Sequence, residues 1–210
     1  DATAEGDITL GAVVASNGLE TGIVLDAGGS IEADEVTLVT ILFNADANGS
    51  IALGDVDASY GSVVTLNAGG GIEMEDVELA GSMLDATANA GNVTLLTLTA
   101  NSGSTAAFKA EAATGNISAG DVTASGSYVT LNAGDRITAG AVKLDGSTFT
   151  ATANAPAAVN GTITLTTLTA KNLSNATLTA KGNILSGDVT LEGGTLTVNS
   201  SGGTATFGKV

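Results

Sequence analysis

A short apolar pattern returns ten times along the chain at nearly constant spacing, and this repeat limits the possible folds more than any other feature. Each copy follows a glycine or another turn-forming residue. Successive copies begin about 22 residues apart, a period typical of solenoids, in which each repeat stacks on the next. The copies begin at Ile8, Ile31, Ile51, Ile72, Val93, Ile117, Ile137, Ile163, Ile184 and, in a degenerate form, Ala205.

Each repeat contains three short runs in which apolar and polar residues alternate. In one repeat the runs are ISA (117–119), VTA (122–124) and VTLNA (129–133), divided by Gly-Asp and Ser-Gly-Ser turns. Alternation with a period of two predicts strands that bury one face and expose the other. The apolar residues expected on the buried face are Ile117, Ala119, Val122, Ala124, Val129, Leu131 and Ala133.

Runs this short do not suit a meander, because hairpins need strands of ordinary length. Three runs and three turns instead form one coil, which buries its apolar face only when the next coil stacks on it. We therefore expect an all-β fold, a parallel β-solenoid or β-helix of about ten coils, each of about 21–22 residues with three short strands. With stacked strands about 4.8 Å apart, such a rod would be roughly 45 Å long.

Two imperfect copies show where a coil tolerates an extra residue. The phrase GDVDASYGSVVTLNAG at 54–69 returns at 120–134 as GDVTASGSYVTLNAG, and the extra residue lies between Ser59 and Val63. Stacked strand residues must keep their register, whereas a turn can bulge outward at little cost. The largest bulge is expected at 154–160, which contains the only proline of the chain.

The sequence also contains a longer repeat, which spans several coils. The phrase VTLNAG at 64–69 returns at 129–134, three repeats later, which indicates duplication of a three-coil block. We expect one solenoid domain over residues 1–210, with blocks at approximately 49–114 and 115–181, cut from a longer array.

Composition sets limits on the core and on the partners. Only 3% of the residues are aromatic while 43% are hydrophobic, so the core must be thin and filled mainly by aliphatic side chains. A formal charge of −16 argues against binding to nucleic acid or to an anionic membrane surface, since both require basic patches. No apolar run is long enough to cross a bilayer. The first residues, DATAEGD, resemble no leader peptide, which fits a cytosolic chain or the mature part of an exported one.

The sequence of the repeats is similar to that of a known family. Gly-[Asn/Asp/Ser]-Ile-x-[Ala/Leu]-Gly-Asp-Val-x-[Ala/Leu], followed by Val-Thr-Leu-x-Ala-Gly, resembles the repeats of filamentous-haemagglutinin-like bacterial exoproteins and surface adhesins, over nearly the whole chain. The resemblance implies a right-handed β-helical shaft that lies outside the cell or on its surface and displays adhesive regions. The amino-terminal secretion domain of that family has no counterpart in this sequence.

Acidic residues are distributed very unevenly. Residues 1–108 hold 16 of the 22 acids and no lysine or arginine, whereas six acids and six bases follow. Glu35, Asp55 and Asp76 are expected at equivalent turn positions of consecutive coils. Carboxylates stacked about 5 Å apart form an oxygen-rich cluster that suits Ca²⁺. The alternative is a solvated face that salt screens, and the nonapeptide of calcium-binding solenoids does not occur.

Threonine columns form a second candidate surface. The pairs Thr130/Asn132, Thr150/Thr152, Thr177/Thr179 and Thr197/Asn199 are expected on the outward face of the third run in four coils. Such a lattice could order water, as ice-binding solenoids do. In other coils the same face carries Ala107/Lys109 and Asp85/Thr87, which interrupt it, and threonine also favours strands for reasons of packing alone.

Nothing in the sequence predicts catalysis. The chain has no histidine, cysteine or tryptophan and a single arginine, so the side chains of a sugar-cleaving β-helix are largely missing. We therefore expect a non-catalytic shaft of an extracellular fibre or adhesin, without a required cofactor, that joins further repeats or copies end to end and meets a host glycan or protein. A Ca²⁺- or glycan-binding module is the first alternative, and an ice-binding protein is the second.

Overall fold

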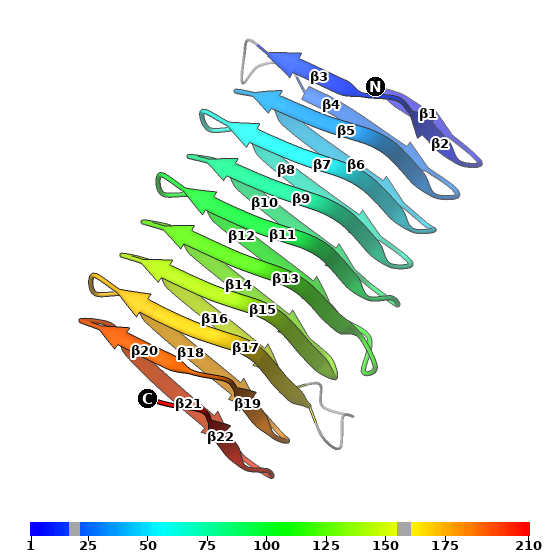
Figure 1. The fold of residues 1–210 in the computed structure, drawn as a ribbon. Helices are drawn as coiled ribbons and strands as arrows, with labels where there is room; N and C mark the ends of the chain where they lie inside the picture. Colours follow the sequence, from blue (N-terminus) through cyan, green and yellow to red (C-terminus); the bar gives the residue numbers. More distant parts are fainter. Residues whose placement is uncertain (17–21, 155–160) are drawn as a thin grey trace.

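The computed structural model describes residues 1–16, 22–154 and 161–210, and all of their regular structure is β-strand. Two parallel sheets face each other (Figure 1). Sheet A contains β1 (Ala2–Ala4), β4 (Gly22–Ala27), β6 (Leu42–Ala47), β8 (Val63–Ala68), β10 (Met83–Ala88), β12 (Thr105–Ala110), β14 (Tyr128–Ala133), β16 (Thr148–Ala153), β18 (Asn175–Ala180) and β21 (Thr195–Ser200). Sheet B contains β2 (Ile8–Leu10), β3 (Val13–Ser16), β5 (Ile31–Val39), β7 (Ile51–Ser59), β9 (Ile72–Ala80), β11 (Val93–Asn101), β13 (Asn116–Ser125), β15 (Arg136–Asp145), β17 (Thr162–Lys171), β19 (Ile184–Ser186), β20 (Val189–Glu192) and β22 (Ala205–Phe207).

The chain alternates between the sheets, so that one strand of sheet B and the next strand of sheet A form a coil. Each strand pairs with its counterpart in the neighbouring coil, and the described chain makes about nine turns. The predicted parallel β-solenoid is confirmed. Val36, Val56 and Val77 are direct register partners, as the stacking of repeats requires. The seven residues expected to be buried between Ile117 and Ala133 are all buried.

The strand pattern differs from the expected three short strands per coil. In the seven coils from β5 to β17, the first two runs form one long strand, and they separate only into β2 and β3 and into β19 and β20. Alternation shifts phase in the middle of each long strand, where two consecutive residues face outward. We call this pair the bend. Because the neighbouring coil bends at the same place, pairing skips only the bend and resumes beyond it in the same register, so no strand ends there.

The recurring Gly-Asp pair has a structural explanation at the bend. A Cβ on Gly54 would lie 1.7 Å from the carbonyl oxygen of Asp34 in the preceding coil, so the backbone passes where no side chain fits. The next residue, Asp55, uses Oδ1 to accept a hydrogen bond from the Asp76 N–H of the following coil, at 3.3 Å. The carboxylate therefore replaces a backbone acceptor where the ladder is interrupted.

The same arrangement occurs at two later bends. A Cβ on Gly120 would lie 1.8 Å from the carbonyl oxygen of Leu96, and the Oδ1 of Asp121 accepts from Ala141 N–H at 2.8 Å. Gly187 and Asp188 repeat it, with Lys209 N–H as the donor at 2.9 Å. At these three bends the Gly-Asp pair is therefore explained by backbone geometry.

The corner from sheet B to sheet A contains the one-residue slip seen in the sequence. Short corners have a single residue with positive φ, as at Gly126, whereas long corners have two, as at Tyr60 and Gly61. The second left-handed residue absorbs the insertion, so the expectation of an outward bulge between Ser59 and Val63 is confirmed. The other expected bulge, at 154–160, falls outside the described residues except for its first position.

A buried serine follows the left-handed residue in six consecutive corners. The Oγ of each serine accepts a backbone N–H from the preceding coil or donates to a carbonyl of its own coil, and most do both. For example, Ser147 Oγ accepts from Ser127 N–H at 3.1 Å and donates to the carbonyl oxygen of Asp145 at 2.9 Å. These buried hydrogen bonds connect each coil to the next at the corner. The members of this serine ladder are Ser62, Ser82, Ser104, Ser127, Ser147 and Ser174.

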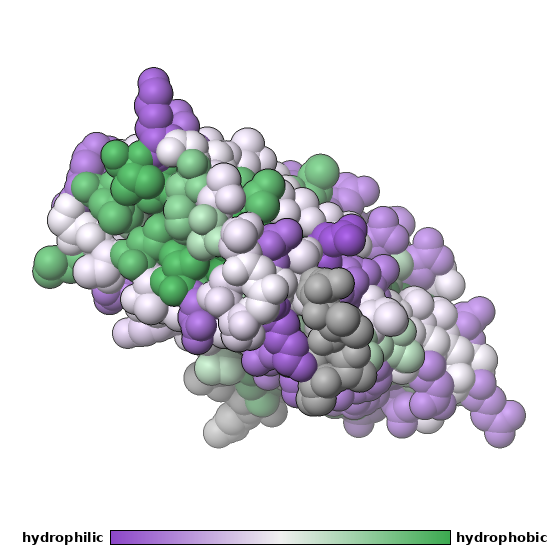
Figure 2. All heavy atoms as spheres, turned by 90° about the horizontal axis from the view of Figure 1, so that it is seen from below, coloured by the Kyte–Doolittle hydropathy of each residue, from purple (hydrophilic) through white to green (hydrophobic). Residues whose placement is uncertain are grey.

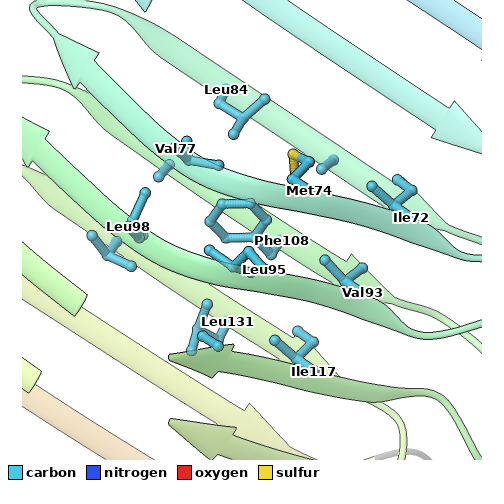
Figure 3. Packing of buried hydrophobic residues seen from close by; sticks show 14 of the residues in the cluster. Ile72, Met74, Val77, Leu84, Val93, Leu95, Leu98, Phe108, Ile117 and Leu131 are labelled. Carbon is cyan, nitrogen blue, oxygen red and sulfur yellow. The ribbon is translucent and has the colours of Figure 1, made fainter. Parts of the chain in front are cut away.

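The core lies between the sheets, and in several strands a large inward side chain is followed or preceded, two residues away, by a small one. Phe108 is 1% exposed, and Figure 3 shows its ring between the sheets near Leu95 and Met74. Ala106, two residues before it, points to the same side of β12. The same pairing occurs in the buried pairs Phe43/Ala45 and Phe149/Ala151. Each large ring is therefore accompanied by a small neighbour, as the constant distance between the sheets demands.

Candidate functional site

The three acids predicted to stack do occupy equivalent bend positions of consecutive coils. Glu35 and Asp55 are direct register partners, and Asp76 follows in the next coil. Each of them has a hydrogen bond within the protein. Glu35 Oε1 accepts from Thr37 Oγ1 at 3.0 Å, and Asp76 Oδ1 accepts from Thr97 Oγ1 at 2.8 Å. The Asp55 bond to Asp76 N–H and the Asp76 bond to Thr97 join neighbouring coils, whereas the Glu35 bond to Thr37 stays within β5.

A shallow groove lies beside these bends on the outward face of sheet B. Of the three coils that line it, the middle one has the smallest outward side chains, Ala52 and Gly54. The coils above and below contribute the acids Glu32, Asp34, Glu73 and Glu75. The groove is therefore anionic on two sides, and its depth comes from two small residues between longer ones.

These carboxylates have no basic side chain in their own half of the sequence, because residues 1–108 contain no lysine or arginine. The ion pairs between described residues are Lys109 with Glu111 and Lys171 with Glu192, the latter at 2.9 Å. Within the described part of the chain, no three acids converge closely enough to enclose a metal ion. The Ca²⁺ site at Glu35, Asp55 and Asp76 therefore stays a prediction of the sequence.

Salt is expected to stabilise the protein by screening the repulsion among the carboxylates of its acidic half. The Debye length falls from about 30 Å at 0.01 M salt to about 3 Å at 1 M, so the denaturant midpoint should rise over this range. Ca²⁺ and Mg²⁺ at equal ionic strength should raise it equally. Circular dichroism during denaturant titration measures these midpoints.

The control for this experiment is Asp55→Asn, which keeps the oxygen that accepts from Asp76 N–H but removes the charge. Its midpoint should respond less to NaCl than that of the parent protein. A rise specific to Ca²⁺ that this substitution abolishes would contradict simple screening and would establish a cation site at the bend.

The predicted threonine columns are in register. Thr130, Thr150, Thr177 and Thr197 are successive partners in β14, β16, β18 and β21. Asn132, Thr152, Thr179 and Asn199 form a second column beside them. In the other direction the columns continue into Ala107 and Lys109, as expected.

Sequence reasoning missed two polar features. The buried serine ladder was overlooked because serine next to glycine in a turn is ordinarily exposed. The feature that could have indicated it is the constant position of a serine one residue after the left-handed residue of the corner. An amide ladder on sheet A was also missed. Asn67 Nδ2 donates to Asp46 Oδ1 at 2.7 Å, and Asn89 Nδ2 donates to Asn67 Oδ1 at 3.0 Å.

The described residues form no helix that could cross a membrane.

Comparison with known proteins leaves the fold as the main guide to function. No protein-family model matches the chain, and neither the curated proteins nor the solved structures include a match to it.

Proposed function

We propose that this chain is a non-catalytic shaft of an extracellular fibre or cell-surface adhesin. The supporting observation is the continuity of the ladders, which run from β1 to β21 in sheet A and from β2 to β22 in sheet B. Each coil is held by its neighbours on both sides, so the stability of such a rod is the sum of similar interfaces. A rod of this kind keeps its length and shape when it projects a binding region from a surface.

Polar groups add to the contacts between coils. The serine ladder and the bend aspartates provide hydrogen bonds that cross from one coil to the next in addition to the backbone ladders. Removing such a bond inside the wall leaves a desolvated partner and costs more than losing an exposed one. These bonds favour a mechanical role.

We further propose that a covering coil joins each end of the rod, supplied either by more repeats or by a second copy. The last coil presents partly exposed apolar side chains, including Leu196, Val198 and Phe207. Figure 2, which views the molecule from below in Figure 1, shows hydrophobic side chains gathered on this face. At the other end, Leu10 and Val13 are only partly buried against the core. Unpaired strand edges with apolar side chains favour pairing with another strand.

Residues at the same position of successive coils form columns, and these columns define how a second copy would fit. Ile8 belongs to the same column as Ala205, and Leu10 to that of Phe207. A copy stacked head to tail would therefore place apolar residues on apolar residues in these two columns of sheet B, and Ala2 on Val198 in sheet A. Because this contact uses two different surfaces and does not close, it would generate a filament. The excess of acids toward β1 and the lysines toward β22 favour the same polarity.

Electron microscopy of the purified chain tests this proposal. We expect rods roughly 45 Å long and, at high protein concentration, filaments that extend end to end. Val198→Lys, on the exposed end of the core, should shorten the filaments, while Thr164→Lys on an outward face should not. Compact particles that are not rods would contradict the shaft. Rods that never join at any concentration would contradict stacking of copies.

A further inference from the structure

The outward face of sheet A in the last four coils differs from every other strand face of the rod that the structure describes. Its twelve outward positions contain eight threonines, three asparagines and one tyrosine, and none is charged. We call this surface the neutral lattice. Its members are Tyr128, Thr130, Asn132, Thr148, Thr150, Thr152, Asn175, Thr177, Thr179, Thr195, Thr197 and Asn199.

Backbone geometry arranges these side chains in two dimensions. All four strands are parallel and paired residue by residue without a bulge. Neighbouring strands are about 4.8 Å apart, and outward residues two positions apart along a strand are about 6.6 Å apart. Figure 1 shows these strands lying side by side in nearly the same direction. The hydroxyl groups therefore repeat in both directions over a flat area.

The central hydroxyls are available to water. Among the described residues, the side chains of Thr150, Thr152, Thr177 and Thr179 have no hydrogen-bond partner within the protein. At the edge of the lattice Thr195 Oγ1 donates to Asn175 Oδ1, and toward the acidic end of the rod Asp46, Asn67 and Asn89 bond to one another. The four threonines are also half-buried among their neighbours. Because a β-branched side chain in a packed strand has few rotamers, these hydroxyls are fixed in place.

We propose that the neutral lattice binds the surface of ice. A small soluble ligand favours a concave site that covers most of its surface, which a flat sheet face does not provide. A crystal of water offers a flat, periodic partner, and fixed hydroxyls can hydrogen-bond to its oxygens without a large loss of side-chain entropy. Threonine methyl groups between the hydroxyls add apolar contact. The lattice ends where Ala107 and Lys109 enter the columns.

This proposal is independent of the shaft, so the two can fail separately. The test uses the whole chain, frozen slowly with a growing ice crystal, and measures the fraction of protein that enters the ice and the thermal hysteresis of the solution. We expect the parent protein to enter the ice and to depress the freezing point below the melting point. Thr177→Lys places a charge at the centre of the lattice and should reduce both signals severalfold.

The matched control is Thr164→Lys, which places the same charge on the outward face of sheet B in the same coil and should keep both signals. Circular dichroism verifies that the variants fold, and Thr130→Lys, at an exposed lattice position, replaces Thr177→Lys if the latter unfolds. Exclusion of the folded parent protein from ice, or equal loss in lattice and control variants, overturns the proposal. Retention on insoluble polysaccharide without any affinity for ice would overturn it as well.

Discussion

Replacement of Phe108 by alanine is expected to lower the free energy of unfolding by about 3–5 kcal/mol. The ring is fully enclosed between the sheets, and its small partner Ala106 cannot fill the space that would be left. The backbone cannot easily collapse into the space, because β12 is paired residue by residue with β10 on one side and with β14 on the other. Denaturant unfolding followed by circular dichroism measures the loss.

Compensation within the strand provides the control for this prediction. Ala106→Leu alone should overpack the coil and destabilise it by about 1–3 kcal/mol. Combined with Phe108→Ala, the same leucine should occupy the vacated space, so the double variant should be more stable than the sum of the single changes predicts. Strict additivity would show that the two positions do not share one volume.

Removal of one buried serine hydroxyl should cost about 1–3 kcal/mol when it leaves a backbone N–H without an acceptor. Ser147→Ala meets this condition, because the Ser147 Oγ is the acceptor that the structure provides for the buried N–H of Ser127. Ser127 lies in a short corner with one left-handed residue, Gly126. The loss in unfolding free energy can be measured by the same denaturant titration.

Ser127→Ala is the matched control, since it removes an equally buried hydroxyl from the same ladder. Its donor, the Ser104 N–H, also bonds to the carbonyl oxygen of Asn101 at 3.2 Å within a long corner. That N–H keeps an acceptor after the substitution, so Ser127→Ala should be less damaging than Ser147→Ala. If the control variant were the less stable of the two, the assignment of the ladder bonds would be wrong.

The two kinds of candidate surface differ in how far the sequence could define them. The threonine columns could be predicted residue by residue, because Thr150 and Thr177 lie in strands whose register follows from the repeat. The stacking of Glu35 and Asp55 could be predicted for the same reason. What these acids contact could not, because Asp55 bonds to a backbone N–H of another coil and the sequence gives no sign of that donor.

The solenoid, the inward columns and the position of the one-residue slip can all be predicted from the repeat pattern. Each follows from a local rule, because a side chain in a parallel stack must fit above its equivalent in the previous repeat. In contrast, the joining of the first two runs through a bend and the burial of six corner serines become evident only in the folded protein. Both depend on hydrogen bonds between residues about one coil apart, whose partners meet only after the coils have stacked.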